Sequence, residues 1–311
     1  MIKILRIYFI FYLILFLSQC LQAQQAMTFP KEKWSIASPK SQGVDSLKMV
    51  DALDVLSKYC HEDGIEETLI IRNGKVIFQG DSVTKVHNVW SCSKSFTTTV
   101  LALLIEQGKC KLDDYAAKYE PLLQDNYPKV TLRQLASMTS GYSAKGGDRY
   151  DGWVSPDWSW TPYAPDVPYS EPGTIFQYWD ENMMMLGRVL TQIAGKDIYS
   201  VIKEAITDKI DLGDWSWKTE KALKGIHINN GCTNVFMNAT QLARMGLLFL
   251  NNGNWNGEQL LNKDWVKNAT SNQVPDNFGL LADDRLLDGR GKYGYGYGVK
   301  KSFISRVFST S

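Results

Sequence analysis

The stretch Trp90-Ser91-Cys92-Ser93-Lys94-Ser95-Phe96, followed by the apolar run from Thr97 to Ile105, decides the fold. It predicts a loop that enters a helix at Ser91, with Lys94 one turn further along. Residues three apart lie on the same face of a helix, so the amine of Lys94 is expected to reach the Ser91 hydroxyl. A helix N-terminus also favours negative charge on a nearby oxygen. A hydroxyl is a poor nucleophile until a base takes its proton, which makes Lys94 the candidate base.

The S-x-x-K pattern occurs three times, at Ser82/Lys85, Ser91/Lys94 and Ser200/Lys203. Ser82 lies in a polar stretch after a predicted strand, and Ser200 lies inside a predicted amphipathic helix. Both are interpreted as surface residues. The pattern alone is therefore weak, and the surroundings of Ser91 have to support its assignment.

Residues 1–23 are predicted to be a signal peptide. Two basic residues precede an apolar run from Ile7 to Leu17, which is too short to span a bilayer. Cleavage is expected after Ala23. The alternatives are an uncleaved membrane anchor and a lipoprotein anchored at Cys20, although Gln19 is bulky where that signal has a small residue. We predict a periplasmic or secreted protein with no stable membrane span after processing.

The charge balance excludes some classes of partner. The chain has 34 basic and 33 acidic side chains, and loss of the signal peptide removes two basic ones, which leaves a net charge of about −1. This gives no basic surface for nucleic acid, so no nucleic-acid partner is predicted. The oligomeric state is left open.

No metal or organic cofactor is expected. The three histidines form no H-E-x-x-H motif, and the cysteines match no metal-binding spacing. Cys60, Cys92, Cys110 and Cys232 remain after processing and have the chemistry for a disulfide, whose pairing the sequence does not fix. Cys92 is predicted to be a buried, small apolar side chain.

Helices and strands are predicted along the rest of the chain. A helix capped at Asp45 or Ser46 precedes a hairpin that turns at Asn73-Gly74. The remaining expectations are an apolar helix face carrying Leu47, Val50, Leu53 and Leu56, helix caps at Thr131 and Thr240, a helix from Met183 to Ile193 ended by Gly195, and a strand at Tyr293 to Val299 whose glycines allow close backbone contact.

The segment from Tyr142 to Glu171 differs in kind, because tryptophans and tyrosines alternate with prolines. Trp153, Trp158 and Trp160 belong to it. Such a segment either walls a substrate cleft or packs as a proline-stiffened surface loop. The sequence leaves both readings open.

Taken together, the chain resembles the serine β-lactamase and penicillin-binding protein superfamily. It is most similar to the class C β-lactamase-like serine hydrolases, the branch of esterases and 6-aminohexanoate-dimer hydrolase. The resemblance runs in order from about Trp34 to Tyr297, over Ser91 to Lys94, Thr131 to Gly141, Pro172 to Tyr178, Leu186-Gly187 and Thr240 to Gly253.

The resemblance implies a fold and a set of roles. The fold is an α/β (α+β) sandwich, an antiparallel sheet flanked by helices, with a mostly helical lobe at roughly residues 110–225. Ser91 would be the acylated nucleophile, Lys94 its general base, and Tyr178 the second proton carrier. Asp180, Trp179 and Trp160 are the predicted substrate-binding residues.

The second signature of the family, Y-x-N, is altered here. Its third position is commonly asparagine and is Asp180 in this chain. An amide both donates and accepts hydrogen bonds, whereas a carboxylate only accepts them. A carboxylate near Lys94 would also hold the amine protonated unless it is turned away or paired. This favours an esterase or amidase over a β-lactamase.

The third signature, K-T-G or H-x-G, does not follow Tyr293 to Val299. The nearest stretch is Lys301-Ser302-Phe303, which lacks the glycine. We therefore expect residues 24–311 to form one serine hydrolase domain that is truncated at the C-terminus and lacks its last strands.

The sequence thus predicts a serine hydrolase that acts on a small ester or amide through an acyl-enzyme. One alternative is a penicillin-binding D-Ala-type peptidase or a β-lactamase. The other is a truncated, non-catalytic relative, which is either a binding protein or a gene remnant.

Overall fold

The computed structural model describes residues 27–60, 64–145, 162–223, 225–280 and 293–298. The predicted signal peptide with Cys20, the tryptophans from Trp153 to Trp160 and the segment from Lys300 to Ser311 lie outside the described residues. In the part of the chain that is described, no helix is both long enough and apolar enough to cross a membrane.

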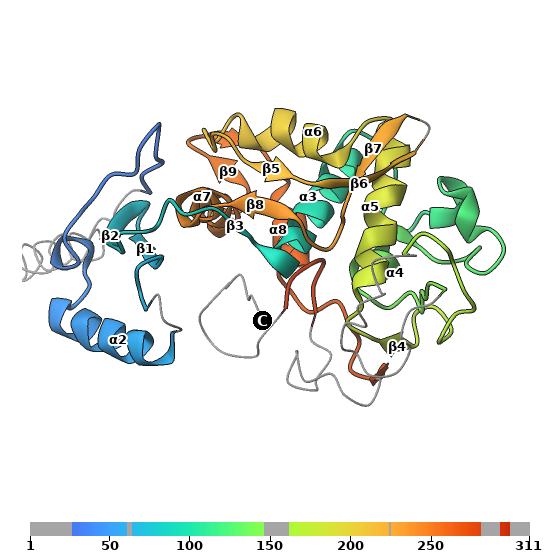
Figure 1. The fold of residues 1–311 in the computed structure, drawn as a ribbon, viewed down its shortest axis with the longest axis horizontal. Helices are drawn as coiled ribbons and strands as arrows, with labels where there is room; N and C mark the ends of the chain where they lie inside the picture. Colours follow the sequence, from blue (N-terminus) through green and yellow to red (C-terminus); the bar gives the residue numbers. More distant parts are fainter. Residues whose placement is uncertain (1–26, 61–63, 146–161, 224, 281–292, 299–311) are drawn as a thin grey trace, which may run out of the picture. The chain divides into compact units, whose positions relative to one another are not determined.

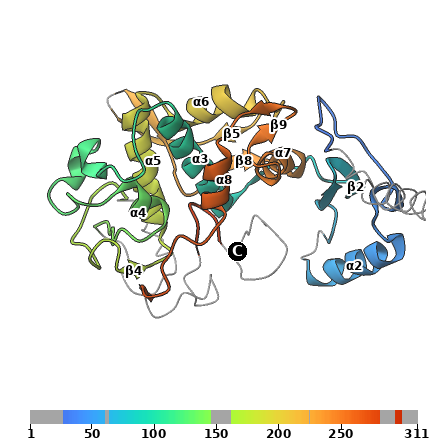
Figure 2. The same cartoon turned by 180° about the vertical axis from the view of Figure 1, so that it is seen from behind.

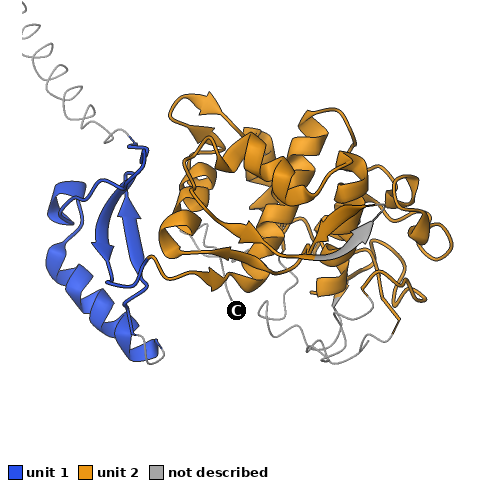
Figure 3. Cartoon of the chain, turned by 45° about the horizontal axis from the view of Figure 1, so that its top comes forward, with its two compact units in different colours: residues 1–83 blue, residues 84–311 orange. Residues whose placement is uncertain are grey.

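The chain divides into two compact units, residues 1–83 and residues 84–311 (Figure 3). The described α-helices are α2 (Ser46–Tyr59), α3 (Ser93–Glu106), α4 (Leu132–Ala136), α5 (Asp180–Ala194), α6 (Ile198–Ile202), α7 (Ala239–Leu250) and α8 (Lys263–Ala269). Short helical turns are η1 (Lys40–Gln42), η2 (Trp90–Cys92), η3 (Ala116–Lys118), η4 (Pro121–Leu123) and η5 (Lys203–Thr207).

The strands are short and form small sheets. They are β1 (Leu69–Arg72), β2 (Lys75–Gln79), β3 (His87–Asn88), β4 (Ile175–Phe176), β5 (Ser216–Trp217), β6 (Thr219–Leu223), β7 (Ile226–Asn229), β8 (Val235–Met237), β9 (Asn254–Trp255), β10 (Glu258–Gln259) and β11 (Gly279–Leu280). The pairs β1–β2, β6–β7 and β9–β10 and the sheet β3–β8–β5 are antiparallel, and β4–β11 is parallel. The mixed helix and strand composition confirms the predicted α/β (α+β) class.

The first unit contains the predicted hairpin. Asn73 and Gly74 have φ angles of 53° and 75°, the left-handed values that a tight two-residue turn requires. The cap of α2 is also confirmed, because Asp45 Oδ1 accepts hydrogen bonds from the backbone N–H groups of Leu47 and Lys48. The expected apolar face of this helix is largely exposed, with Leu47 at 79% and Val50 at 62%.

The second unit is built around α3. Every residue of α3 from Ser93 to Leu104 is buried. Figures 1 and 2 show α5 beside α3 in both views, and α6 also packs against α3. A helix that is buried all round needs apolar neighbours on every side, which explains its long apolar run.

Helix starts in this unit follow their capping residues. Thr131 caps α4 in a capping box with Gln134, as predicted. The predicted cap of α7 at Thr240 is wrong. Asn238 caps α7, because its Oδ1 accepts from the N–H of Gln241 at 3.0 Å and also from the Thr240 hydroxyl at 2.7 Å. An asparagine two residues upstream thus satisfies the exposed N–H groups first.

The Tyr-Gly stretch packs as predicted but is not a regular strand in its described part, residues 293–298, where Tyr293 and Gly298 form an isolated bridge. Its tyrosines are buried. A Cβ on Gly294 would lie 1.9 Å from the carbonyl oxygen of Ala269, and one on Gly296 would lie 2.7 Å from that of Lys94. The alternating glycines therefore let this stretch approach the backbone of α3 and α8.

Gly231 makes a similar close approach to α5. A Cβ at this position would lie 1.9 Å from the carbonyl oxygen of Met183 and 3.2 Å from the backbone nitrogen of Gly187. Both obstacles belong to backbone, which moves less easily than a side chain. The absence of a side chain at Gly231 therefore fixes how closely the loop after β7 packs on α5.

We predict that Gly231→Ala destabilises the protein by about 2 kcal/mol, because the new methyl group forces the loop away from α5. For a unit of this size the melting temperature should fall by about 5 °C in a thermal unfolding scan. Gly279→Ala is the control, since its Cβ would lie 3.3 Å from the Ile175 side chain and 3.8 Å from the nearest backbone atom, the carbonyl oxygen of Thr174. Equal melting temperatures for the two variants would contradict the packing argument.

Candidate active site

Ser91 lies in a strained turn just before α3. The preceding residue, Trp90, has φ = +45°, which is unusual for a residue with a side chain. Asn88 holds this turn, because its Oδ1 accepts hydrogen bonds from the N–H groups of Trp90 at 2.9 Å and Asn234 at 3.2 Å. Left-handed residues of this kind cluster at functional sites, where the surrounding structure compensates for the strain.

Hydroxyl groups of α3 anchor the helix to two distant loops. Thr97 Oγ1 donates to the carbonyl oxygen of Gly231 at 2.7 Å, and Thr98 Oγ1 donates to that of Tyr295 at 2.9 Å. Ser93 Oγ accepts from the N–H of Val235 at 3.2 Å. The first turns of α3 are thus fixed against segments far along the chain.

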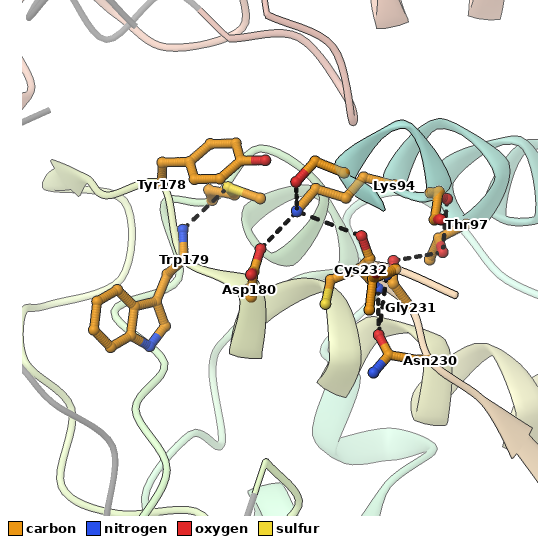
Figure 4. A network of polar contacts seen from close by, with 12 residues as sticks. Lys94, Thr97, Tyr178, Trp179, Asp180, Asn230, Gly231 and Cys232 are labelled. Carbon is orange, nitrogen blue, oxygen red and sulfur yellow. Dashed lines mark hydrogen bonds and ion pairs between the residues drawn. The ribbon is translucent and has the colours of Figure 1, made fainter. Parts of the chain in front are cut away.

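Lys94 is the centre of the site. Its Nζ lies 2.8 Å from Ser91 Oγ and 2.6 Å from Asp180 Oδ1, and it is 3.5 Å from the carbonyl oxygen of Cys232 (Figure 4). The Lys94 side chain is only 1% exposed. The predicted contact between Ser91 and Lys94 is therefore present in the structure.

Tyr178 lies on another side of the same nitrogen. Its ring centroid is 4.8 Å from Lys94 Nζ, and its ring meets that of Tyr293 edge-on with centroids 5.9 Å apart. Figure 4 shows Tyr178, Asp180 and Cys232 arranged around the Lys94 nitrogen. Residues from α3, from the start of α5 and from the loop after β7 thus converge on one point.

The charges around Lys94 favour its protonated form. Burial by itself lowers the pKa of Lys94, but the negative charge of Asp180, helped by Tyr178, Cys232 and Tyr293, raises it well above the ordinary value. Burial raises the pKa of Tyr178 as well, and the positive charge of Lys94 only partly offsets this effect. At neutral pH the site therefore contains an ammonium group and a neutral phenol.

The predicted substrate-binding residues divide into three cases. Asp180 lies in the site, turned toward Lys94 rather than away from it. Trp179 lies beside it, but its indole points away from the Lys94 nitrogen in Figure 4 and donates to Glu181 Oε2 at 2.7 Å. Its role as a substrate contact stays a prediction. Trp160 lies outside the described residues.

Glu181 was not predicted. It is 1% exposed, and its Oε2 also accepts from the N–H of Ala144 at 3.1 Å. Burial raises its pKa to about 6. This carboxylate joins the start of α5 to the loop that begins the aromatic and proline-rich segment. The acidic pair Asp180-Glu181 in the first turn of α5 was the available sequence signal.

Asn230 and Cys232 were also missed. Asn230 Oδ1 accepts from the N–H groups of Cys232 at 2.9 Å and Thr233 at 3.1 Å, which orients the Cys232 carbonyl group toward Lys94. A backbone carbonyl contributes no motif, so only the turn-forming pair Asn230-Gly231 marks this loop in the sequence. Cys92, next to Ser91, is buried as predicted, and burial raises its pKa to about 11.

The other two S-x-x-K serines have different partners. Ser200 Oγ donates to Asp197 Oδ2 at 2.8 Å, while Lys203 pairs with Asp208. Ser82 Oγ donates to Glu66 Oε2 at 3.2 Å. The tertiary structure thus separates the Ser91 pair from its two sequence equivalents.

Comparison with known proteins identifies the family. The family model described as Beta-lactamase matches residues 68–308. An uncharacterised protein of Alkalihalophilus pseudofirmus is 25% identical over 195 residues, which cover 62% of this chain and 56% of that protein. The chain spans about half the length of the curated relatives that it matches.

Solved structures show the same fold. A proposed beta-lactamase from Bacteroides dorei superposes with a TM-score of 0.63 at 20% identity, over 79% of this chain and 78% of that one. A proposed 6-aminohexanoate-dimer hydrolase from Bacillus anthracis gives a TM-score of 0.55 at 20% identity, over 73% of this chain and 63% of that one. Since the family model extends over well more than half of the sequence and includes Ser91, Lys94 and Tyr178, this chain belongs to the Beta-lactamase family.

Proposed function

We propose that the chain is a serine hydrolase that forms an acyl-enzyme at Ser91 on a small ester or amide. The observation that carries this proposal is the contact of 2.8 Å between the buried Lys94 Nζ and Ser91 Oγ, with Tyr178 beside it. An adjacent basic group is what a serine hydroxyl needs to become a nucleophile. We also propose, from the N-terminal sequence, that the protein is periplasmic or secreted.

In the proposed reaction, Lys94 must first lose a proton to become a free amine. The amine then takes the proton of Ser91 while Oγ attacks the carbonyl carbon, whose π electrons move to the carbonyl oxygen. When that oxygen re-forms the double bond, the bond to the leaving group breaks. The leaving group takes up the proton from Lys94, with Tyr178 as the second carrier. A water molecule then repeats the sequence and releases the acid.

The ion pair with Asp180 favours an esterase or amidase over a β-lactamase. Asp180 Oδ1 lies 2.6 Å from Lys94 Nζ, where the family pattern has an amide. A carboxylate cannot donate a hydrogen bond to the carbonyl group of a substrate amide. It also repels the negatively charged group that β-lactams carry.

The same ion pair supports a second candidate, a non-catalytic relative that binds a ligand without acylation. Lys94 held as an ammonium ion is a poor base. Covalent labelling of Ser91 distinguishes the two candidates, because only the hydrolase has an activated hydroxyl group.

We predict that a fluorophosphonate adds one phosphonyl group to the purified chain, because Lys94 activates Ser91, and that Ser91→Ala abolishes this addition. Intact-mass spectrometry measures the adduct. Ser82→Ala and Ser200→Ala are matched controls from the other S-x-x-K patterns, and both should keep it. Labelling that survives in Ser91→Ala would overturn the assignment of the nucleophile. A folded wild-type chain that takes no label would support the non-catalytic alternative.

We predict that the kcat/KM of the wild-type enzyme for a neutral ester rises with pH through the neutral and alkaline range. The reactive form is the free amine of Lys94, whose fraction grows with pH as long as the pH is below its raised pKa. Asp180→Asn removes the charge that raises this pKa, so the pH profile should shift to lower pH by about one to three units.

The control for this shift is Glu181→Gln, which removes the next carboxylate along the chain. Glu181 makes its hydrogen bonds to Trp179 and Ala144, and it is not among the groups that raise the pKa of Lys94. The kcat/KM of Glu181→Gln for the neutral ester should rise with pH over the same range as that of the wild type. Identical profiles for the wild type and Asp180→Asn would show that Lys94 is not the titrating base.

A further inference from the structure

The two partners of the central ion pair differ in their access to solvent. The Lys94 side chain is 1% exposed, whereas that of Asp180 is 23% exposed. Oδ1 of Asp180 is buried against Lys94. Within the described part of the chain, Lys94 is the ion-pair partner of the Asp180 carboxylate. No hydrogen bond from a described residue reaches the other carboxylate oxygen, Oδ2. The accessible partner of the ion pair is therefore the Asp180 side chain, and not the Lys94 ammonium group.

The Asp180 carboxylate lies close to the reacting hydroxyl group, since both contact the same Lys94 nitrogen. A single atom, Lys94 Nζ, bridges Asp180 Oδ1 and Ser91 Oγ, at 2.6 Å and 2.8 Å. A substrate whose carbonyl carbon sits at Ser91 Oγ thus brings the first few atoms of its acyl group next to Asp180. A carboxylate accepts hydrogen bonds only, so the complementary group on the substrate must be a donor.

Catalysis also leaves Asp180 without its counter-ion. Lys94 has to become a neutral amine before it takes the Ser91 proton, and the carboxylate then stays beside a buried, uncharged group. Among the described residues, the other charged or titratable groups that face Lys94 are Tyr178, Cys232 and Tyr293, and none of them can supply a positive charge. A carboxylate in a largely buried site is strongly destabilised when its paired cation is lost.

We propose that Asp180 is a specificity-determining residue that binds an ammonium group of the substrate's acyl part, and that this group replaces Lys94 as the counter-ion of the carboxylate. The substrate class is therefore aminoacyl esters and amides with a free amine a few atoms from the scissile carbonyl group. This inference rests on the proposed hydrolase function and adds to it the charge of the acyl group.

The exchange of counter-ions couples binding to activation. A bound ammonium group pairs with Asp180 and repels the Lys94 ammonium ion, so both effects release the Lys94 proton to water. The free amine then takes the Ser91 proton as described above. An acyl group with a negative charge should bind and react poorly. Asp180 repels it, and its charge favours the protonated form of Lys94.

The test compares three p-nitrophenyl esters of similar size: 3-aminopropanoate, which is cationic, butanoate, which is neutral, and hydrogen malonate, which is anionic. We expect wild-type kcat/KM at about pH 7.5 to be at least about tenfold higher for the cationic ester than for butanoate, and lowest for malonate. In Asp180→Asn the ratio of cationic to neutral ester should fall to about one. In Glu181→Gln, the neighbouring carboxylate variant, it should stay at the wild-type value.

A second measurement needs no variant. In the wild type, kcat for butanoate should still rise steadily with pH between about pH 6 and pH 8.5, because Lys94 stays mostly protonated there. Over the same range kcat for the cationic ester should rise less steeply, because the bound ammonium group lowers the pKa of Lys94. If Asp180 had only a structural role, kcat for the two esters would depend on pH in the same way. Measurements between about pH 6 and pH 8.5 keep the substrate amine protonated.

The outcomes separate the two proposals. Hydrolysis of butanoate that depends on Ser91, with no preference for the cationic ester, overturns the role of Asp180 and leaves the proposed function in place. A preference that persists in Asp180→Asn also overturns it, since another group would then bind the amine. No Ser91-dependent hydrolysis of any of the three esters by the folded chain overturns the proposed function itself.

Discussion

The buried ammonium group of Lys94 is the constraint on which the rest of the site depends. A charge that is almost fully removed from water persists only where hydrogen-bond acceptors and an opposite charge surround it. Here Ser91 Oγ, Asp180 Oδ1 and the carbonyl oxygen of Cys232 lie 2.8, 2.6 and 3.5 Å from Nζ. These three groups come from positions 91, 180 and 232, so the fold must hold three separate segments around one nitrogen. Loss of any of the three leaves the charge less well compensated.

The packing of unit 2 holds these three segments around the Lys94 nitrogen. Thr97 and Thr98 tie α3 to the loops at Gly231 and Tyr295, and Gly231 and Gly296 lack the side chains that would keep these loops away. On the other side, Glu181 joins the first turn of α5 to Trp179 and Ala144. Its burial and raised pKa mean that the folded protein retains a carboxylate where a neutral amide would be easier to bury. The buried carboxylate of Glu181 and the left-handed backbone at Trp90 each cost stability. Such costly features are typical of functional sites, where the geometry of the site takes precedence over local stability.

The substitution of Asp180 for the usual asparagine changes the resting charge of the site rather than its layout. The Ser91–Lys94 contact is short, so the predicted pair is in place. The carboxylate, however, keeps Lys94 protonated, and the proposed reaction requires that this effect be relieved. In the proposed reaction a cationic acyl group would relieve it, because it would compete with Lys94 for the same carboxylate. The same interaction that makes Lys94 a weak base in the free protein would then make its activation depend on the correct substrate.

By itself, the sequence determined the features that depend on local chemistry. The apolar run after Ser91 and the spacing of three to Lys94 defined α3 and the contact of this pair. Asn73-Gly74 defined the hairpin turn, and Thr131 with Gln134 defined the start of α4. The resemblance in motif order led to the family and to Tyr178. Only the tertiary structure decided which way Asp180 and the Trp179 indole turn and that the Cys232 carbonyl group faces Lys94. It also decided that Glu181 ties α5 to Ala144 and that Asn238 rather than Thr240 caps α7. The Trp179 indole turns toward Glu181, two residues further on, which is itself held by Ala144. The other features depend on contacts between segments about 40 to 140 residues apart or on competition between neighbouring caps, and no local pattern encodes the outcome of either.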